Sequence, residues 1–219
     1  KMGKYLASRE DVESALVLVR PGERENPRTE MMIEGIRDGL RGEVDLLNVV
    51  EPEIPQKVLE EYKERFRERN APPPSAENQD AEMQKLEIDE NQIKRQIPVR
   101  KWLTPKRMDE VLAPYQGRFD VLISAMGMLP AMEKSERLSR EDGPAIAIVD
   151  GVSRVGQYTK KIKSKDILGI VIRSPTARID LEKMPPGDVD EAFKKRYLLI
   201  THENVKELEE NKDYSTLFR

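Results

Sequence analysis

Polar residues stand directly after short apolar runs along this chain, and their types are those that hold small ligands. The candidates are Arg20, Gly22, Ser124, Gly127, Asp150, Gly151, Ser153, Arg173, Ser174 and His202. Guanidinium groups, hydroxyls and glycine backbone N–H groups together suit a small polar or anionic ligand. Turns and helix caps require the same residue types, so a structural role stays open for each of them.

Catalytic arrangements are harder to find. Asp150 and His202 both follow an apolar run and could form an acid–base pair, which with Arg173 would act on a small anionic substrate. The segment GVSRVGQYT (residues 151–159) has the glycine spacing of a phosphate-binding loop, but Gln157 stands where the loop's lysine belongs. No G-x-S-x-G nucleophile motif is present. The sequence therefore favours a non-enzymatic protein and leaves an enzyme open.

The composition limits the kinds of site that the chain can build. Charged residues make up 36% and hydrophobic residues 37% of the 219 residues, and the net charge of −3 gives no strong attraction to DNA or RNA. The absence of cysteine excludes disulfides and thiolate sites, and the single histidine argues against a histidine metal site. We therefore expect no metal, no cofactor, no nucleic-acid partner and no membrane span.

Short apolar runs rich in Val, Ile and Leu predict the strands of one sheet. The runs are Ala15–Val19, Val44–Val50, Asp120–Ala125, Ala145–Val149, Ile167–Ile172 and Tyr197–Thr201. They alternate little with polar residues, which is typical of strands covered by helices on both faces. Helical patterns separate most of them, so we predict a single α/β domain over residues 1–219 with a three-layer, doubly wound, mostly parallel sheet, Rossmann- or flavodoxin-like. If all the strands run the same way, the candidate residues gather at one edge.

Capping signals place the helices between these strands. Asn26 is expected to cap a helix that ends at Gly42, and Thr104 is expected to cap a second helix. Pro130 is expected to open a helix along PAMEKSERLSR. Thr201 is expected to cap the helix that follows the last strand.

One segment, residues 55–98, does not fit the alternation of strands and helices. Two charged helical stretches flank the sequence APPPSAENQ, whose prolines prevent one continuous helix. We predict a charged helical hairpin, partly flexible, inserted into the domain. It is either a solvated excursion that packs one edge on the body, or a docking arm for a protein partner or a second copy of the chain.

Four stretches follow a known pattern, namely EGIRDGL, DVLISAMGMLP, AIAIVDGV and DILGIVI. They resemble the first lobe of type I periplasmic-binding-like proteins, especially uncharacterised substrate-binding proteins of ABC transporters. The resemblance covers about half of the chain and implies a non-enzymatic lobe that recognises a small ligand or a partner at its strand ends. That family closes two lobes on its ligand, and this chain is long enough for one, so binding would need an open crevice or a dimer.

Two alternatives to a ligand-binding lobe stay open. An interaction protein would assemble through the helical hairpin, and an enzyme would use Asp150, Arg173 and His202. The opening KMGKYLASRED does not look like a natural start, although an expression remnant would also explain it. We expect an upstream signal or anchor, and with it a periplasmic or membrane-anchored extracytoplasmic location.

Overall fold

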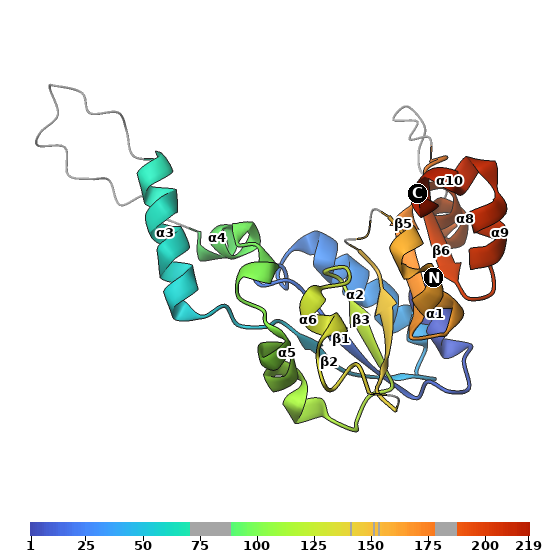
Figure 1. The fold of residues 1–219 in the computed structure, drawn as a ribbon, viewed down its shortest axis with the longest axis horizontal. Coiled ribbons are helices and arrows are strands. Elements are labelled where there is room, and N and C mark those ends of the chain that lie inside the picture. Colours follow the sequence, from blue (N-terminus) through green and yellow to red (C-terminus); the bar gives the residue numbers. More distant parts are fainter. Residues whose placement is uncertain (71–88, 141, 151, 153, 178–187) are drawn as a thin grey trace, which may run out of the picture.

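Six strands form one sheet in the computed structural model, which describes residues 1–70, 89–140, 142–150, 152, 154–177 and 188–219. The strands are β1 (Ser14–Leu18), β2 (Asp45–Val50), β3 (Val121–Ser124), β4 (Ala145–Ile148), β5 (Ile167–Arg173) and β6 (Tyr197–Thr201). Their order is β2-β1-β3-β4-β5-β6, and every neighbouring pair is parallel except β5 and β6 (Figure 1). The predicted α/β fold with a mostly parallel sheet is confirmed, and each apolar run forms its strand.

The strand order places a topological switch point between β1 and β3. The chain leaves β1 toward β2 on one side and later returns to add β3 on the other. Asp120 fixes the start of this pairing, because its carboxylate accepts hydrogen bonds from the backbone N–H of Glu13 and of Ser14, at 2.9 and 2.8 Å. In doubly wound sheets, ligands usually bind at the carboxyl ends of the strands beside such a switch point.

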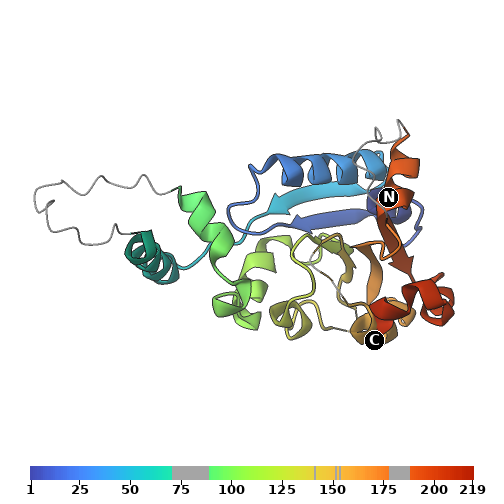
Figure 2. The same cartoon turned by 90° about the horizontal axis from the view of Figure 1, so that it is seen from above.

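Helices cover both faces of the sheet and make the three layers. One face, called the α2 face, is covered by α1 (Met2–Ala7) and α2 (Pro27–Leu40). The other, called the α5 face, is covered by α5 (Pro105–Leu112), α6 (Pro130–Glu133), α7 (Thr159–Lys163), α9 (Val205–Glu210) and α10 (Ser215–Phe218). Figure 2 shows α2 and the green helices on opposite sides of the sheet. The buried residues accordingly form two separate clusters, one on each face.

Two helices lie where the hairpin was predicted, α3 (Gln56–Asn70) and α4 (Glu90–Gln96). Leu59 of α3 and Ile93 of α4 are buried in the cluster of the α5 face. Val58, Tyr62 and Phe66 of α3 pack against the same cluster, and α3 lies at the end of the molecule far from the C-terminus (Figure 1). The predicted proline turn, in residues 71–88, lies outside the described residues.

The remaining helices are α8 (Val189–Arg196) and the short 3₁₀ turns at Val99–Lys101, Ala113–Tyr115, Gly156–Tyr158 and Lys212–Tyr214. Gly156 packs against the C-terminal segment, since a Cβ there would lie 2.4 Å from the backbone oxygen of Phe218. In the part of the chain that the structure describes, no helix has both the length and the apolar character that a bilayer crossing requires.

Three predictions for helix ends need correction. Thr201 ends β6 and caps no helix; α9 begins after Asn204, whose side chain accepts from the Thr201 N–H at 2.8 Å. The helix from Pro130 stops after 4 residues, and the N–H groups of Glu136 and Arg137, which a longer helix would use, donate to Asp109 of α5. The helix capped by Asn26 ends at Leu40, with Arg41 in the left-handed conformation ahead of Gly42.

Candidate functional site

The residues after β1 hold α4 against the carboxyl edge of the sheet. Arg20 Nη2 donates to the carbonyl of Ile97 at 3.0 Å, and Arg95 Nε donates to the carbonyl of Gly22 at 2.7 Å. The loop after β1 thus donates a hydrogen bond to the segment that ends α4, and α4 donates one back to the loop. Gly22 is buried with φ +78°, and its N–H donates to Glu51 Oε1 at 2.7 Å. At these two predicted ligand residues, Arg20 Nη2 and the Gly22 backbone are thus bonded within the protein, while the buried Arg20 Nε has no hydrogen-bond partner among the described residues.

The predicted serines and Gly127 support the turns at their strand ends. Ser124 is fully buried, and its hydroxyl donates to the carbonyl of Gly127 at 2.7 Å while accepting from the N–H of Met126. Gly127 has φ +76°, a conformation that favours glycine. Ser174 is also buried, and its hydroxyl accepts from the N–H of Thr176. These hydrogen bonds fit the structural role that the sequence left open for Ser124, Gly127 and Ser174.

Asp150 and Arg173 are the predicted residues whose side chains reach solvent at the carboxyl edge. Asp150 Oδ2 lies 3.5 Å from Arg28 Nη2 of α2, with 56% and 80% of the two side chains exposed. Arg173 is exposed at the end of β5. Gly151 and Ser153 lie outside the described residues. An exposed ion pair of this length contributes about 1 kcal/mol at most.

The placement of His202 at the same edge is wrong. β6 is antiparallel to β5, with Thr201 opposite Gly169 and Tyr197 opposite Arg173, so β6 ends at the amino-end edge of the sheet. β6 begins at the same edge at which β5 ends. The Ser174 N–H, just after β5, donates to the carbonyl of Arg196, just before β6. Four strand residues separate the two edges by roughly 13 Å. Asp150, Arg173 and His202 therefore do not form one catalytic group.

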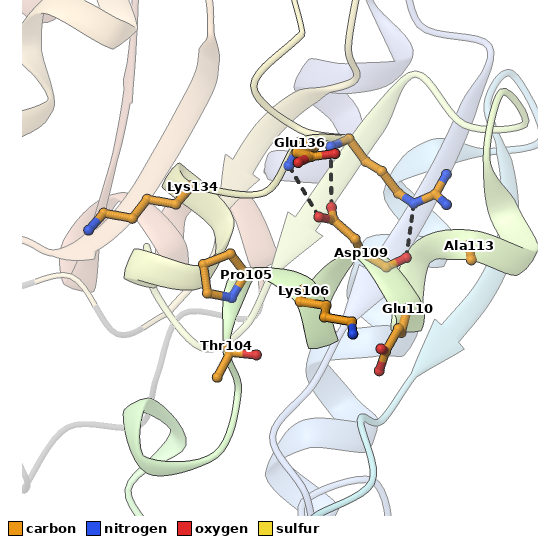
Figure 3. Close-up of a pocket in the computed structure, with 9 residues that line it drawn as sticks. Thr104, Pro105, Lys106, Asp109, Glu110, Ala113, Lys134 and Glu136 are labelled. Atoms are coloured by element: carbon orange, nitrogen blue, oxygen red, sulfur yellow. Dashed lines mark hydrogen bonds between the residues drawn. The ribbon is translucent and has the colours of Figure 1, made fainter.

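A hollow of about 640 Å³ lies between α5 and the chain after α6, and none of the predicted ligand residues lines it (Figure 3). Its lining residues are Thr104, Pro105, Lys106, Asp109, Glu110, Ala113, Lys134, Glu136 and Arg137. Thr104 caps α5 as predicted, its hydroxyl accepting from the Arg107 N–H at 3.3 Å. Five residues and α6 separate the end of β3 from Lys134, Glu136 and Arg137, which form one wall of the hollow.

Asp109 ties the two walls of this hollow together (Figure 3). Its carboxylate accepts from the Ser135 hydroxyl at 2.5 Å and from the N–H groups of Glu136 and Arg137, each at 3.2 Å. Arg137 Nε donates back to the carbonyl of Asp109 at 2.9 Å. Ser135 is fully buried, so its hydroxyl has no access to water as an alternative partner. The floor of the hollow is thus fixed by side chains that are already engaged.

Six charged side chains border the hollow. Asp109 and Arg137 are hydrogen-bonded in its wall, and the other four are two ammonium groups and two carboxylates: Lys106, Lys134, Glu110 and Glu136. Among the described residues, none of these four side-chain charges has a hydrogen bond or an ion pair, although many other charged groups of the chain do. Within the same residues, no group of three or more His, Cys, Asp or Glu side chains is placed to hold a metal ion. The hollow therefore offers unpaired charges of both signs to solvent.

A smaller hollow of about 280 Å³ lies on the other side of α5. Glu51, Pro52, Glu53, Arg107, Glu110 and Val111 line it. Arg107 Nη2 donates to the carbonyl of Glu53 at 3.0 Å, which fixes its guanidinium to the chain after β2. Glu110 borders both hollows, so the exposed side of α5 separates them.

Low pH should weaken the hydrogen bonds by which the Asp109 carboxylate holds residues 135–137 against α5. Desolvation alone would raise the pKa of Asp109, but the hydrogen bonds from Ser135 and from the N–H groups of Arg137 and Glu136 outweigh it and hold this pKa below its ordinary value of 3.8. A lowered folded-state pKa adds stability above the unfolded value, and this stability is lost as pH falls through the folded value. We expect the free energy of unfolding, measured with urea, to fall less steeply below pH 3.8 in Asp109→Asn than in the wild type. Equal slopes would contradict this.

Sequence reasoning missed the hollow, although it identified the cap at Thr104. No local pattern shows that residues 135–137 fold back on α5, because Asp109 meets its partners only in the tertiary structure. Comparison of the chain with protein-family models, with curated proteins and with solved structures finds no match. The fold and the geometry of its surface are therefore what a functional proposal can use.

Proposed function

We propose that this chain is a non-enzymatic binding domain, similar to one lobe of a periplasmic substrate-binding protein, that holds a small polar ligand in the hollow between α5 and residues 134–137. The observation that carries the proposal is the set of unpaired charges around this hollow. Its volume of about 640 Å³ is in the range of small-molecule sites.

The charges favour a ligand that carries both signs. A purely anionic ligand would meet Lys106 and Lys134 but also the carboxylates of Glu110 and Glu136. A purely cationic ligand would meet the two carboxylates but would be repelled by Lys106 and Lys134. Lys106 and Lys134 point in different directions (Figure 3), so a zwitterion, such as an amino acid or a short peptide, can place its carboxylate near one ammonium group and its amine near a carboxylate.

The strength of such binding is limited by exposure. Lys106, Lys134, Glu110 and Glu136 are all exposed, and exposed ion pairs contribute about 0–1 kcal/mol each. A few such ion pairs, together with a contact to the Thr104 hydroxyl, give the ligand a dissociation constant on the order of a millimolar. The site therefore requires a test that detects weak binding.

A thermal-shift screen with amino acids, dipeptides, phosphate, acetate and neutral sugars tests the proposal. At ten times its dissociation constant, a ligand stabilises the folded state by about 1.4 kcal/mol, which raises Tm by about 3–5 °C for a chain of this size. We expect this rise with zwitterions, and a much smaller one with phosphate or acetate.

The double variant Lys106→Ala/Lys134→Ala should lose most of the stabilisation, because both ammonium groups are removed and the remaining cation, Arg137, is held by Asp109 and Gln116. Lys206→Ala is the matched control, since Lys206 is an exposed lysine on α9, away from the hollow. The proposal fails if no zwitterion stabilises the protein, or if the double variant responds as the control does.

A further inference from the structure

Among the described strands, β2 lies at one edge of the sheet and has an irregular register with its neighbour β1. Ala15 of β1 pairs with Leu46, but the next residue, Leu16, pairs with Asn48, so β2 carries one extra residue. Leu46 and Val49 pack in the cluster of the α2 face, while Leu47 and Val50 pack in that of the α5 face. Side chains along β2 thus alternate between the two faces except at Asn48, which belongs to neither cluster. A bulge of this kind frees one side chain from both faces of a sheet.

The Asn48 side chain covers a backbone donor on the free edge. The Val50 carbonyl accepts from the Val19 N–H at 2.9 Å, so Val50 directs its backbone groups toward β1. Neighbouring residues in a strand direct theirs to opposite sides, so the N–H of Val49 faces the free edge. Asn48 Oδ1 accepts from this N–H at 2.8 Å. The Val49 N–H, which an added strand would need as a donor, is therefore already bonded.

Tyr115 holds Asn48 in this position. Asn48 Nδ2 donates to the Tyr115 hydroxyl at 2.6 Å, and the Tyr115 ring packs against the cluster of the α5 face. The amide of Asn48 is thus oriented at both ends, with its oxygen on Val49 and its nitrogen on Tyr115. An exposed surface asparagine without such partners would turn freely and leave the edge open part of the time.

We propose that Asn48, oriented by Tyr115, blocks the free edge of β2 from pairing with β2 of a second copy of this chain. Unpaired edge strands present donors and acceptors to any similar edge, and every copy of the chain carries the same one. The half-buried Leu46 and Val49 beside the edge would add apolar contact to such a pair. The bulge and the bonded N–H oppose this association.

Sedimentation velocity over a range of concentrations tests the proposal with Asn48→Val. Valine keeps a strong preference for strands but has no acceptor for the Val49 N–H. We expect the average mass of the variant to rise with concentration toward about twice that of the wild type, as in a two-fold pair. In dilute solution, the Val49 amide should exchange with solvent faster than in the wild type. Tyr115→Phe should shift both readouts in the same direction but less.

Asp45→Val is the control, because it adds the same apolar residue to the same strand and leaves the bond between Asn48 and Val49 intact. It should associate less than Asn48→Val. Equal association of the two variants would show that added apolar surface decides the outcome, which overturns the proposal. An Asn48→Val chain that keeps the wild-type mass at every concentration while remaining folded by circular dichroism overturns it too.

Discussion

Gly22→Ala should lower the free energy of unfolding by about 3 kcal/mol, because two costs add at this position. Gly22 has φ +78°, where a Cβ costs about 1–2 kcal/mol, and that Cβ would lie 2.7 Å from the backbone oxygen of Asn91 in α4. Relieving such a contact between backbones shifts α4 and typically costs about 1–3 kcal/mol. Urea unfolding at neutral pH measures the loss.

Gly42→Ala is the matched control for this prediction. Gly42 has φ +76°, but nothing lies within 4 Å of the Cβ that alanine would add. It should therefore lose only the cost of the conformation, about 1 kcal/mol. Equal losses in the two variants would mean that α4 does not rest on Gly22.

Asp109→Ala should cost about 3 kcal/mol and should also remove the hollow. The substitution leaves the fully buried Ser135 hydroxyl without its acceptor and releases the N–H groups of Glu136 and Arg137. A buried donor without a partner costs about 1–3 kcal/mol, whereas the exposed Glu136 can turn to water at little cost. Urea unfolding gives the stability, and the thermal-shift response to zwitterions gives the state of the hollow.

Glu110→Ala separates this effect from a general weakening of α5. Glu110 is exposed on the same helix, and its side chain has no hydrogen bond or ion pair within the described residues, so the loss of this side chain should change stability by about 0.5 kcal/mol or less. A similar loss in both variants would contradict the role given to Asp109.

The strands could be predicted because the information for each is local. A run such as Ile167–Ile172 is apolar throughout, and only a strand buried on both faces suits it. The direction of β6 could not be predicted, since an apolar run reads the same whichever way it crosses the sheet. His202 was misplaced for this reason.

The candidate site could be predicted only in part. The carboxyl edge was a sound place to look, but the sequence does not show that Arg20 meets Ile97, 77 positions away. A guanidinium group after a strand has the same sequence pattern whether it binds a ligand or a backbone carbonyl. The hollow depends on contacts of the same long-range kind, between Asp109 and residues 135–137.

The structure also bears on assembly through the hairpin. The apolar residues of α3, among them Val58, Tyr62 and Phe66, pack against the cluster of the α5 face. On its charged side, Glu61 pairs with Arg65 within the helix at 2.5 Å. Lys63 of α3 also pairs with Glu90 of α4 at 3.0 Å. The solvated excursion and the docking arm both stay predictions.

The most direct test of the account is a titration of isotope-labelled protein with the zwitterion that stabilises it most, followed by amide chemical shifts. The account predicts that the amides of residues 104–110 and 134–137 move together with one dissociation constant, while those of Gly22 and Ile97 stay in place. If instead the shifts gather at Arg28, Asp150 and Arg173 and the hollow is unchanged, the ligand sits at the exposed carboxyl edge and the central claim is wrong.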